Sequence, residues 1–485
     1  MPSTSPKTWF DFDMCLCAGL IFLQPFTNLA IKYGDLRIDP ARVLSLLCMA
    51  RLVYILLLRS SRETFSSSVF KRFGIVFLVV VYAFCMTLLQ PAFTSDLGFV
   101  SVEEANGFIL RRGVKYLQFL ALAIYLALIL REPRKIHLAM VSLAAGLSLL
   151  EVLGLLQSIV FTASGIDLFP IKRIVEANGE IQYLDLSVPV TIFGMRFLRV
   201  NSLASEPKVF ALFLNFLFVV KFYWLSYRNV FGFRLPRWLD VYMTKTIWLT
   251  ALMILSTFSG GGIIVFISGL VLIILFGLKK QRGMINPLNS SLKSLLVSSL
   301  VILPPLLFLS INSDRLPEAV SAILDNSLFR RTGALESSIS VDAFYKTLDP
   351  EDGAIIYNII NNPSVLFHGL GFGGFSSLSL IFFKLNFSSY SSSPFSRNIG
   401  IEIIFSVGMV GIVGLLLFFR RINFLYTNGQ SVLSPIYPIL NIIIILNVLI
   451  RSSETLFFIC LGLLVGVSLC DQHLLSFYRN SNSGA

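Results

Sequence analysis

The chain has 485 residues, of which 55% are hydrophobic and 14% are charged, and its mean hydropathy is +0.79. Soluble domains carry roughly 25% charged residues, so this composition excludes a soluble enzyme and predicts an all-α, polytopic integral membrane protein. The formal net charge is +12. The basic residues do not form one soluble patch, which argues against nucleic acid as a partner.

Membrane-spanning helices are predicted from near the N-terminus onward. Residues 1–13 hold one lysine, and the apolar run after them lacks a small-residue cleavage site, so we interpret that run as the first span. A span needs about 20 mostly apolar residues. Hydropathy then predicts about twelve spans, at 14–33, 41–59, 73–93, 113–131, 136–161, 207–227, 244–259, 260–278, 292–312, 398–419, 432–450 and 453–470.

The short loops indicate the orientation of these spans. Five alternate loops carry the basic excess, with the residues Arg59, Arg62, Lys71, Arg72, Arg131, Arg134, Lys135, Arg228, Arg234, Arg237, Lys279, Lys280, Arg282, Arg420 and Arg421. The positive-inside rule makes these loops, and both termini, cytoplasmic. We interpret 1–485 as a single membrane domain with two long outward loops, 162–206 and 313–397, the second of them partly helical and covering the site.

Cysteine and histidine do not indicate a metal or a disulfide framework. The six cysteines all lie within apolar runs, and the chain has three histidines. None of these residues form a cluster with metal-ligand spacing. The sequence therefore predicts neither a metal nor a cofactor.

The outward loops nevertheless carry cations, namely Lys172, Arg173, Arg196, Arg199, Arg315, Arg330, Arg331, Lys346, Lys384 and Arg397. Long loops are translocated largely regardless of charge, so these cations need no topological reason. Two interpretations stay open: attraction to anionic headgroups of membrane lipids, or a site for a phosphorylated substrate at the outer surface.

The stretch from Arg199 through Ser205-Glu206-Pro207 is the most informative part of the chain. Its basic and acidic residues stand at the edge of a predicted span, where charges are costly and usually functional. Arg199, Ser202, Glu206 and Pro207 match the arginine-x-x-serine-to-glutamate-proline signature, so the stretch resembles the superfamily of bacterial O-antigen polymerases and O-antigen ligases. These are multispanning glycosyltransferases that act on lipid-linked sugars.

Three further stretches follow in the order of that family, so the resemblance covers roughly 200–415. They are Ser256 to Gly261, Asn362-Pro363 with Gly369 to Gly373, and Asn398 to Glu402 with Gly408 to Gly411. Two positions depart from the pattern. Gly260 replaces an arginine that is frequent in the family's turn, and Arg397 stands where ligases commonly have a histidine, which favours a polymerase.

The resemblance implies a bacterial inner-membrane enzyme that joins oligosaccharide repeat units carried on polyprenyl diphosphate, donor and acceptor alike, at the periplasmic face. A chain-length regulator is a protein partner that the class allows. Fixed cations would stabilise the departing diphosphate, and arginine suits this role because its planar fork binds phosphate oxygens in pairs. Arg199 and Arg331 are the first candidates. Ser202, Arg330, Gly371 and Arg397 are candidate substrate-binding residues.

Glu206 has three interpretations, which the sequence leaves open. It orients Arg199, it acts as general base for the acceptor hydroxyl, or it belongs to a helix start in which Ser205 is the N-cap and Pro207 the first helical residue. The glycine run Gly369 to Gly374 follows no predicted strand, so we interpret it as a packed turn or as a close approach to phosphate rather than as a dinucleotide motif.

Two further charged residues lie inside predicted spans. We expect Arg51 and Glu151 to pair with each other or to line a cavity, and Lys221 to extend toward the cytoplasm. Two other functions remain open: an O-antigen ligase that transfers polymer to a lipid A core, and a transporter or flippase of lipid-linked oligosaccharides. The absence of a visible internal repeat disfavours the transporter.

Overall fold

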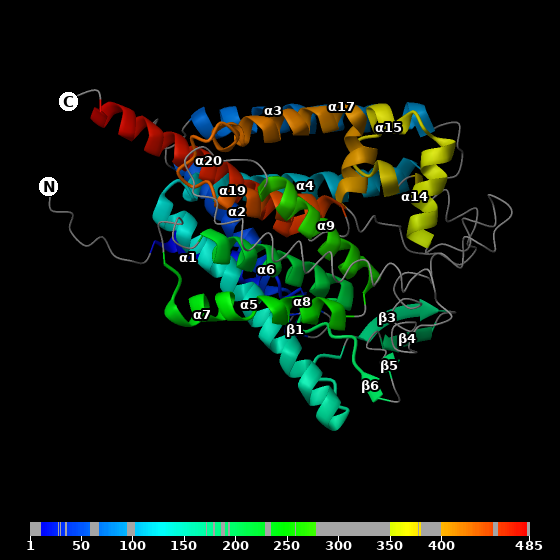
Figure 1. The fold of residues 1–485 in the computed structure, drawn as a ribbon. Coiled ribbons are helices and arrows are strands. Elements are labelled where there is room, and N and C mark those ends of the chain that lie inside the picture. The colour runs from blue at the N-terminus through cyan, green and yellow to red at the C-terminus, as the bar shows by residue number, and fades with distance from the viewer. Residues whose placement is uncertain are drawn as a thin grey trace. The chain divides into compact units, whose positions relative to one another are not determined.

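The fold is predominantly helical (Figure 1). The computed structural model describes residues 11–27, 29, 31–33, 36–58, 67–94, 102–170, 172–177, 180–185, 190–192, 195–227, 234–257, 259–277, 350–376, 378–379, 399–449 and 454–482. The elements are α1 (Phe12–Leu23), β1 (Ile31–Tyr33), β2 (Leu36–Ile38), α2 (Pro40–Leu58), α3 (Ser67–Thr94), α4 (Val102–Ile129), α5 (Pro133–Ser164), β3 (Lys172–Ala177), β4 (Glu180–Asp185), β5 (Val190–Ile192), β6 (Met195–Phe197), α6 (Pro207–Tyr227), α7 (Arg237–Lys245), α8 (Ile247–Ser256), α9 (Gly260–Gly277), α14 (Pro350–Asn361), α15 (Val365–His368), α17 (Ile399–Ile422), α18 (Phe424–Thr427), α19 (Ile436–Leu449) and α20 (Glu454–Asn482).

Within the described residues, seven helices are long and apolar enough to cross a membrane: α2, α3, α4, α5, α6, α17 and α20. Four shorter apolar helices, α1, α8, α9 and α19, accompany them. The chain is therefore a helical, polytopic membrane protein. Each predicted span overlaps one of these helices except 292–312, which lies outside the described residues.

The first helix is shorter than the sequence analysis predicted. The span was expected over 14–33, but α1 ends at Leu23 after 12 residues. Gln24 and Pro25 form a turn, in which Gln24 still has helical φ and ψ of −55° and −38°. The helix does not continue because Pro25 has no backbone N–H to donate to the preceding turn. At 1.5 Å per residue α1 is about 18 Å long, which is less than the roughly 30 Å hydrocarbon core.

Three antiparallel hairpins, pairing β1 with β2, β3 with β4 and β5 with β6, depart from the predicted all-α fold. Each connects its strands through two residues that include a glycine, as in Asn178-Gly179 between β3 and β4. Asn-Gly between alternating apolar residues is a strong hairpin signal. The first predicted outer loop, 162–206, thus contains two of these hairpins.

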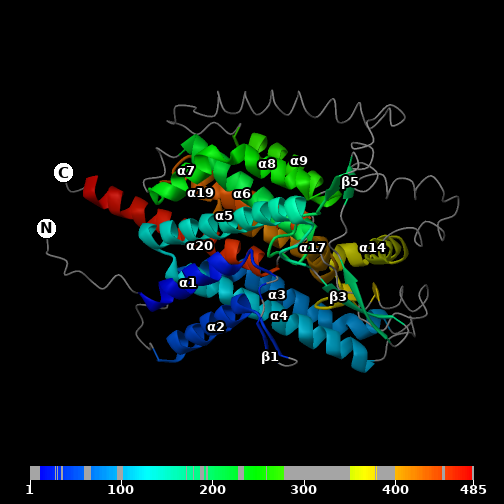
Figure 2. The same ribbon diagram turned by 90° about the horizontal axis from the view of Figure 1, so that it is seen from below.

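The chain divides into two compact units. Unit 1 comprises Met1–Cys48, Arg134–Arg330 and Leu433–Leu446, and unit 2 comprises Met49–Pro133, Arg331–Val432 and Asn447–Ala485. In unit 1, α6 packs against α7, α8 and α9 and lies beside α5 in both ribbon views (Figures 1 and 2). Most residues of α6 are buried, so it forms the core of that unit.

In unit 2, α3 packs against α17 and α4 packs against α20. Two glycines four residues apart, Gly462 and Gly466, allow the second contact. A Cβ on Gly462 would stand 2.6 Å from the carbonyl oxygen of Ala123, and a Cβ on Gly466 would stand 2.6 Å from that of Leu130. Small residues at this spacing let two membrane helices approach backbone to backbone.

Candidate functional site

The segment Leu198–Glu206 joins β6 to α6 and contains three residues that the sequence analysis assigned to the site, Arg199, Ser202 and Glu206. Asn201 and Ser202 are fully buried, whereas Arg199 is partly exposed. The side chain of Arg199 is therefore partly exposed, while the backbone two and three residues after it is buried.

Gln157 of α5 binds this segment with both ends of its side-chain amide. Its Oε1 accepts hydrogen bonds from the backbone N–H of Asn201 at 3.2 Å and of Ser202 at 2.7 Å. Its Nε2 donates to Oδ1 of Asn201 at 2.9 Å and to Oδ1 of Asp167 at 2.6 Å. Because Gln157 is itself fully buried, these bonds fix the backbone beside Arg199 to α5.

Ser202 is the non-glycine residue with a positive φ, 51°, in the part of the chain that the structure describes. Such a conformation costs about 1–3 kcal/mol and persists only where the surroundings impose it. The Ser202 hydroxyl donates to the carbonyl of Leu150 at 2.9 Å. Ser202 was expected to bind substrate. Its observed hydrogen bonds instead attach the segment to α5.

Glu206 occupies the start of α6. Its carbonyl accepts from the N–H of Phe210 at 3.0 Å, which makes Glu206 the N-cap and Pro207 the first helical residue. The prediction that Ser205 is the N-cap is wrong by one residue, and the Ser205 N–H donates to Oγ1 of Thr27 at 2.8 Å. Oε2 of Glu206 lies 3.5 Å from Nζ of Lys208.

The sequence indicates a tight turn between the seventh and eighth predicted spans, at Ser259 to Gly262. In the structure α8 ends at Ser256 and α9 begins at Gly260, so most of the stretch predicted as a turn is the first turn of α9. Gly262 packs so closely on α6 that a Cβ there would stand 2.5 Å from that of Ala211. Nδ2 of Asn215 donates to the carbonyl of Gly262 at 3.2 Å. The start of α9, directly after the stretch that resembles the family's turn, therefore packs on α6, the helix that follows Arg199.

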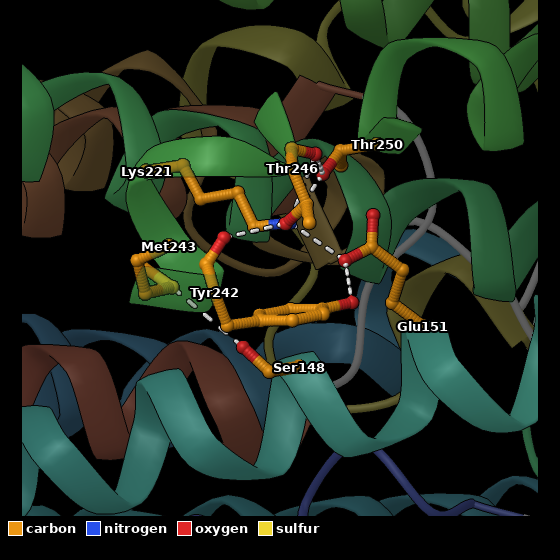
Figure 3. Close-up of polar contacts among 7 residues, drawn as sticks. All are labelled: Ser148, Glu151, Lys221, Tyr242, Met243, Thr246 and Thr250. Atoms are coloured by element: carbon orange, nitrogen blue, oxygen red, sulfur yellow. Dashed lines mark hydrogen bonds and ion pairs between the residues drawn. The ribbon is translucent and has the colours of Figure 1, made fainter. Parts of the chain in front are cut away.

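A buried charged network joins α5, α6 and α7 in the same unit (Figure 3). Nζ of Lys221 lies 2.6 Å from Oε2 of Glu151, and both side chains are fully buried. The ammonium also donates to Oγ1 of Thr246 at 2.8 Å and of Thr250 at 2.7 Å. Every proton of the ammonium therefore has an acceptor within reach.

Tyr242 completes this network from α7, which is not one of the candidate spanning helices. Its hydroxyl donates to Oε2 of Glu151 at 2.5 Å. Burial raises the pKa of Tyr242, and the charge of Glu151 raises it further, so the phenol stays protonated and remains a donor. Two predictions are wrong here: Glu151 pairs with Lys221 rather than with Arg51, and Lys221 is buried rather than extended toward the cytoplasm.

Unit 2 contains a second charged cluster that the sequence analysis missed. Arg112 of α4 lies 3.4 Å from Glu402 of α17 and 3.1 Å from Glu454 of α20, measured between guanidinium nitrogens and carboxylate oxygens. Lys115 also pairs with Glu454. The Arg112 and Glu402 side chains are 5% and 0% exposed, so this cluster holds the first turns of α17 and α20 against α4.

Gly371, a candidate substrate-binding residue, is packed between α3 and α17. Its φ is +79°, and a Cβ on it would stand 2.2 Å from Oγ1 of Thr87. The N–H of Gly371 donates to the carbonyl of Ser406 at 2.9 Å, and Oγ1 of Thr87 accepts from the N–H of Phe372 at 2.8 Å. This geometry fits the interpretation of a packed turn, and the role of Gly371 in binding substrate stays a prediction.

The remaining predicted residues, Arg330, Arg331 and Arg397, lie outside the described residues, as does most of the loop 313–397. The described residues contain no group of three or more His, Cys, Asp or Glu side chains that could hold a metal ion.

No family model, curated protein or solved structure matches this chain. Its function is therefore inferred from the residues and their geometry. One signal could have identified Gln157 in advance: it is an amide within an otherwise apolar stretch of α5, and a polar residue inside a span usually has a function or a partner. Asp167, in contrast, lies in the loop after α5, where no pattern in the sequence distinguishes it.

Proposed function

We propose that this protein is a metal-independent glycosyltransferase that joins polyprenyl-diphosphate-linked oligosaccharide units of an O-antigen or a related surface polysaccharide. The proposed location is a bacterial inner membrane crossed about twelve times, with cytoplasmic termini and the reaction at the periplasmic face. The observation that supports it most is the attachment of the Arg199 segment to α5 through Gln157. A partly exposed arginine on a fixed, buried backbone suits a preorganised contact to a charged leaving group.

The proposed reaction requires that the donor lose its polyprenyl diphosphate as a leaving group. When the bond between the sugar and the diphosphate breaks, positive charge develops at the anomeric carbon and negative charge on the departing oxygens. A guanidinium that is already in position stabilises this charge without reorganising at the moment of reaction. Arg331 is proposed as a second such cation, and Arg330 and Arg397 as contacts to the substrate.

Glu206 is proposed as the carboxylate of this site. Its position at the N-cap of α6 places it near the favourable end of the helix dipole, and its ion pair with Lys208 is partly exposed. Glu206→Gln separates the capping role from the other two. A purely capping residue would tolerate glutamine with normal turnover, whereas orienting Arg199 or accepting a proton requires the charge.

The direct test is polymer formation from purified lipid-linked repeat units in proteoliposomes. Arg199→Ala should lower turnover by roughly 100-fold or more, as the loss of one preorganised charge contact does. Arg199→Lys should recover part of the rate, because lysine keeps the charge but not the bidentate geometry. Arg237→Ala, an exposed arginine on α7, is the matched control. Normal turnover of a stably inserted Arg199→Ala protein would disprove the assignment.

The same assay separates the proposal from its two alternatives. A ladder of products indicates a polymerase, transfer to a lipid A core indicates a ligase, and movement of lipid without bond formation indicates a transporter. One observation favours the transporter, since ionic groups buried among membrane helices often belong to a transport pathway. The hydrogen bonds around Lys221 weigh against this, because they give its ammonium a fixed structural environment.

The proposed orientation is tested by labelling single cysteines in a variant with Cys15 and Cys85 replaced by serine, because these two native cysteines are exposed. A membrane-impermeant maleimide should reach Ser164→Cys, at the C-terminal end of α5, from the periplasmic side. It should reach Ser476→Cys, near the C-terminus, only after the membrane is permeabilised. The reverse pattern would place the Arg199 segment on the cytoplasmic side and disprove the proposed site.

A further inference from the structure

A cavity of about 400 Å³ opens in unit 2, away from the Arg199 segment in sequence. Its lining comes from the first turn and a half of α3, the last turn of α17, the start of α18 and the C-terminal half of α20. The lining residues are Ser68, Lys71, Arg72, Arg421, Phe424 and Gln472. Nothing in the proposed glycosyltransferase reaction uses these residues.

The charge of this lining is positive. Three of its side chains, Lys71, Arg72 and Arg421, are cations, and none of the described residues that line the cavity is acidic. The nearest carboxylate in the sequence is Asp471, beside Gln472. Asp471 accepts hydrogen bonds from Oγ of Ser431 at 2.5 Å and from the N–H of Val432 at 3.1 Å. An anion in the cavity would therefore meet several cations.

The three cations differ in how far they are buried and held by hydrogen bonds. Arg72 is 9% exposed, and its Nη1 donates to the carbonyl of Arg421 at 3.1 Å, which holds the guanidinium against the end of α17. Lys71 and Arg421 are exposed and can adjust to a bound group. The lining thus combines one buried, hydrogen-bonded cation with two exposed ones.

Two further features define the kind of anion. The cavity adjoins the N-terminal turn of α3, whose N–H groups and dipole favour phosphate, and Ser68 adds a hydroxyl. Phe424, which is 55% exposed, provides an apolar wall. A free phosphate has no apolar group that could contact Phe424. A phospholipid carries both a phosphate and acyl chains, so it could contact the cations and Phe424 together.

We propose that this cavity binds the phosphate of an anionic phospholipid of the cytoplasmic leaflet. Basic pockets between membrane helices on the cytoplasmic side are suited to such headgroups, and the proposed orientation places the start of α3 and the end of α17 on that side. The lipid would bridge α3, α17 and α20 within unit 2. This proposal does not depend on the chemistry that the protein catalyses.

The test uses the full chain in a non-ionic detergent, with its thermal midpoint followed by tryptophan fluorescence. Dioleoyl phosphatidylglycerol should raise the midpoint in a concentration-dependent way, because a ligand that binds the folded state stabilises it. Dioleoyl phosphatidylcholine, inorganic phosphate and glycerol phosphate should not. The shift should shrink as salt is added, since exposed charges are screened.

Variants locate the effect. Lys71→Gln/Arg421→Gln should weaken phosphatidylglycerol binding by roughly 30-fold, because each cation near a lipid surface contributes about a factor of five. Arg420→Gln, which removes an adjacent exposed charge from the same helix without touching the lining, is the matched control and should bind normally. If the double variant does not fold, Lys71→Gln alone should weaken binding about fivefold.

Three results would overturn the proposal. A midpoint that does not respond to phosphatidylglycerol would show that the cavity binds no lipid. An equal loss of binding in Arg420→Gln would show general attraction to the basic surface. A shift produced by inorganic phosphate or glycerol phosphate, with the same dependence on Lys71 and Arg421, would assign the cavity to a soluble anion instead.

Discussion

The two units both bury charged side chains, but they do so at different places along their helices. In unit 1, Glu151 lies in the middle of α5 and pairs with Lys221 in the body of α6. In unit 2, Glu402 and Glu454 lie in the first turns of α17 and α20 and share Arg112. The two kinds of position, mid-helix and first turn, differ in which groups other than the ion-pair partner stabilise the carboxylate.

A carboxylate in the first turn of a helix gains from unpaired backbone N–H groups and from the helix dipole, whereas one in the middle of a helix gains from neither. Glu151 therefore depends on Lys221 and Tyr242, while Glu402 and Glu454 have a second source of stabilisation. Exposure differs for one member of the unit 2 cluster: Arg112 and Glu402 are buried like the unit 1 pair, whereas Lys115 is 43% exposed. We expect the unit 1 pair to tolerate the loss of one partner less well.

The largest effect is expected from Lys221→Met. Methionine fills a similar volume but leaves the Glu151 carboxylate buried without its counter-charge, which typically costs about 3–5 kcal/mol. Thermal unfolding of the full chain in detergent measures this loss. Lys221→Met/Glu151→Gln should recover most of the stability, because no uncompensated charge then remains and the introduced amide can still accept from Tyr242.

Either of two results would contradict the expectation that the ion pair in unit 1 depends strongly on both partners. A Lys221→Met protein as stable as the parent would show that Glu151 takes up a proton at little cost. A double variant no more stable than the single one would show that the hydrogen bonds to Thr246 and Thr250, rather than the ion pair, hold the helices together.

A smaller effect, about 2 kcal/mol, is expected from Arg112→Met. The variant removes one charge-assisted contact from each of two carboxylates, but Glu454 keeps Lys115 and both carboxylates keep their helix N-termini. The same unfolding measurement applies. A loss as large as that of Lys221→Met would mean that helix termini contribute little here, and the proposed difference between the units would fail.

Lys115→Met is the matched variant for Arg112→Met and should have the smallest effect, at most ~1 kcal/mol, as for other exposed ion pairs. Added salt should reduce this difference further, because exposed charges are screened more than buried ones. Arg112→Met should show little dependence on salt. A Lys115→Met protein less stable than Arg112→Met would reverse the expected order within unit 2.

The sequence predicted the helices well where hydropathy alone decides them. The apolar runs predicted both ends of α6 and placed α17 to within three residues. The helices α3 and α20 extend beyond their predicted spans, because their polar ends, Ser67 to Arg72 and Asp471 to Asn482, continue the helix outside the apolar run. The end of α1 was missed because a long apolar run continues past Pro25, and the hairpin at Asn178-Gly179 was missed because the loop was considered only for its charge.

The partners of charged residues could not be predicted in the same way. Hydropathy identified Glu151, Arg51 and Lys221 as charges inside spans, but the choice among partners depends on helix rotation, which no local pattern fixes. Gln157 meets Asn201 across 44 residues of sequence, and Arg112 meets Glu454 across 342. Contacts at such separations arise from tertiary packing.

The break in α17 at Gly408 has a consequence for engineering the protein. Gly408 has φ 56° and ψ −164°, so the carbonyls of Phe405 and Ser406 accept from the N–H groups of Leu370 and Gly371, at 2.7 and 2.9 Å. A stretch earlier in the chain thus supplies the donors that an unbroken helix would take from its own next turn. An epitope tag or protease site inserted between Leu370 and Gly371 would therefore displace the hydrogen-bond donors of α17, although the insertion lies well before α17 in the sequence.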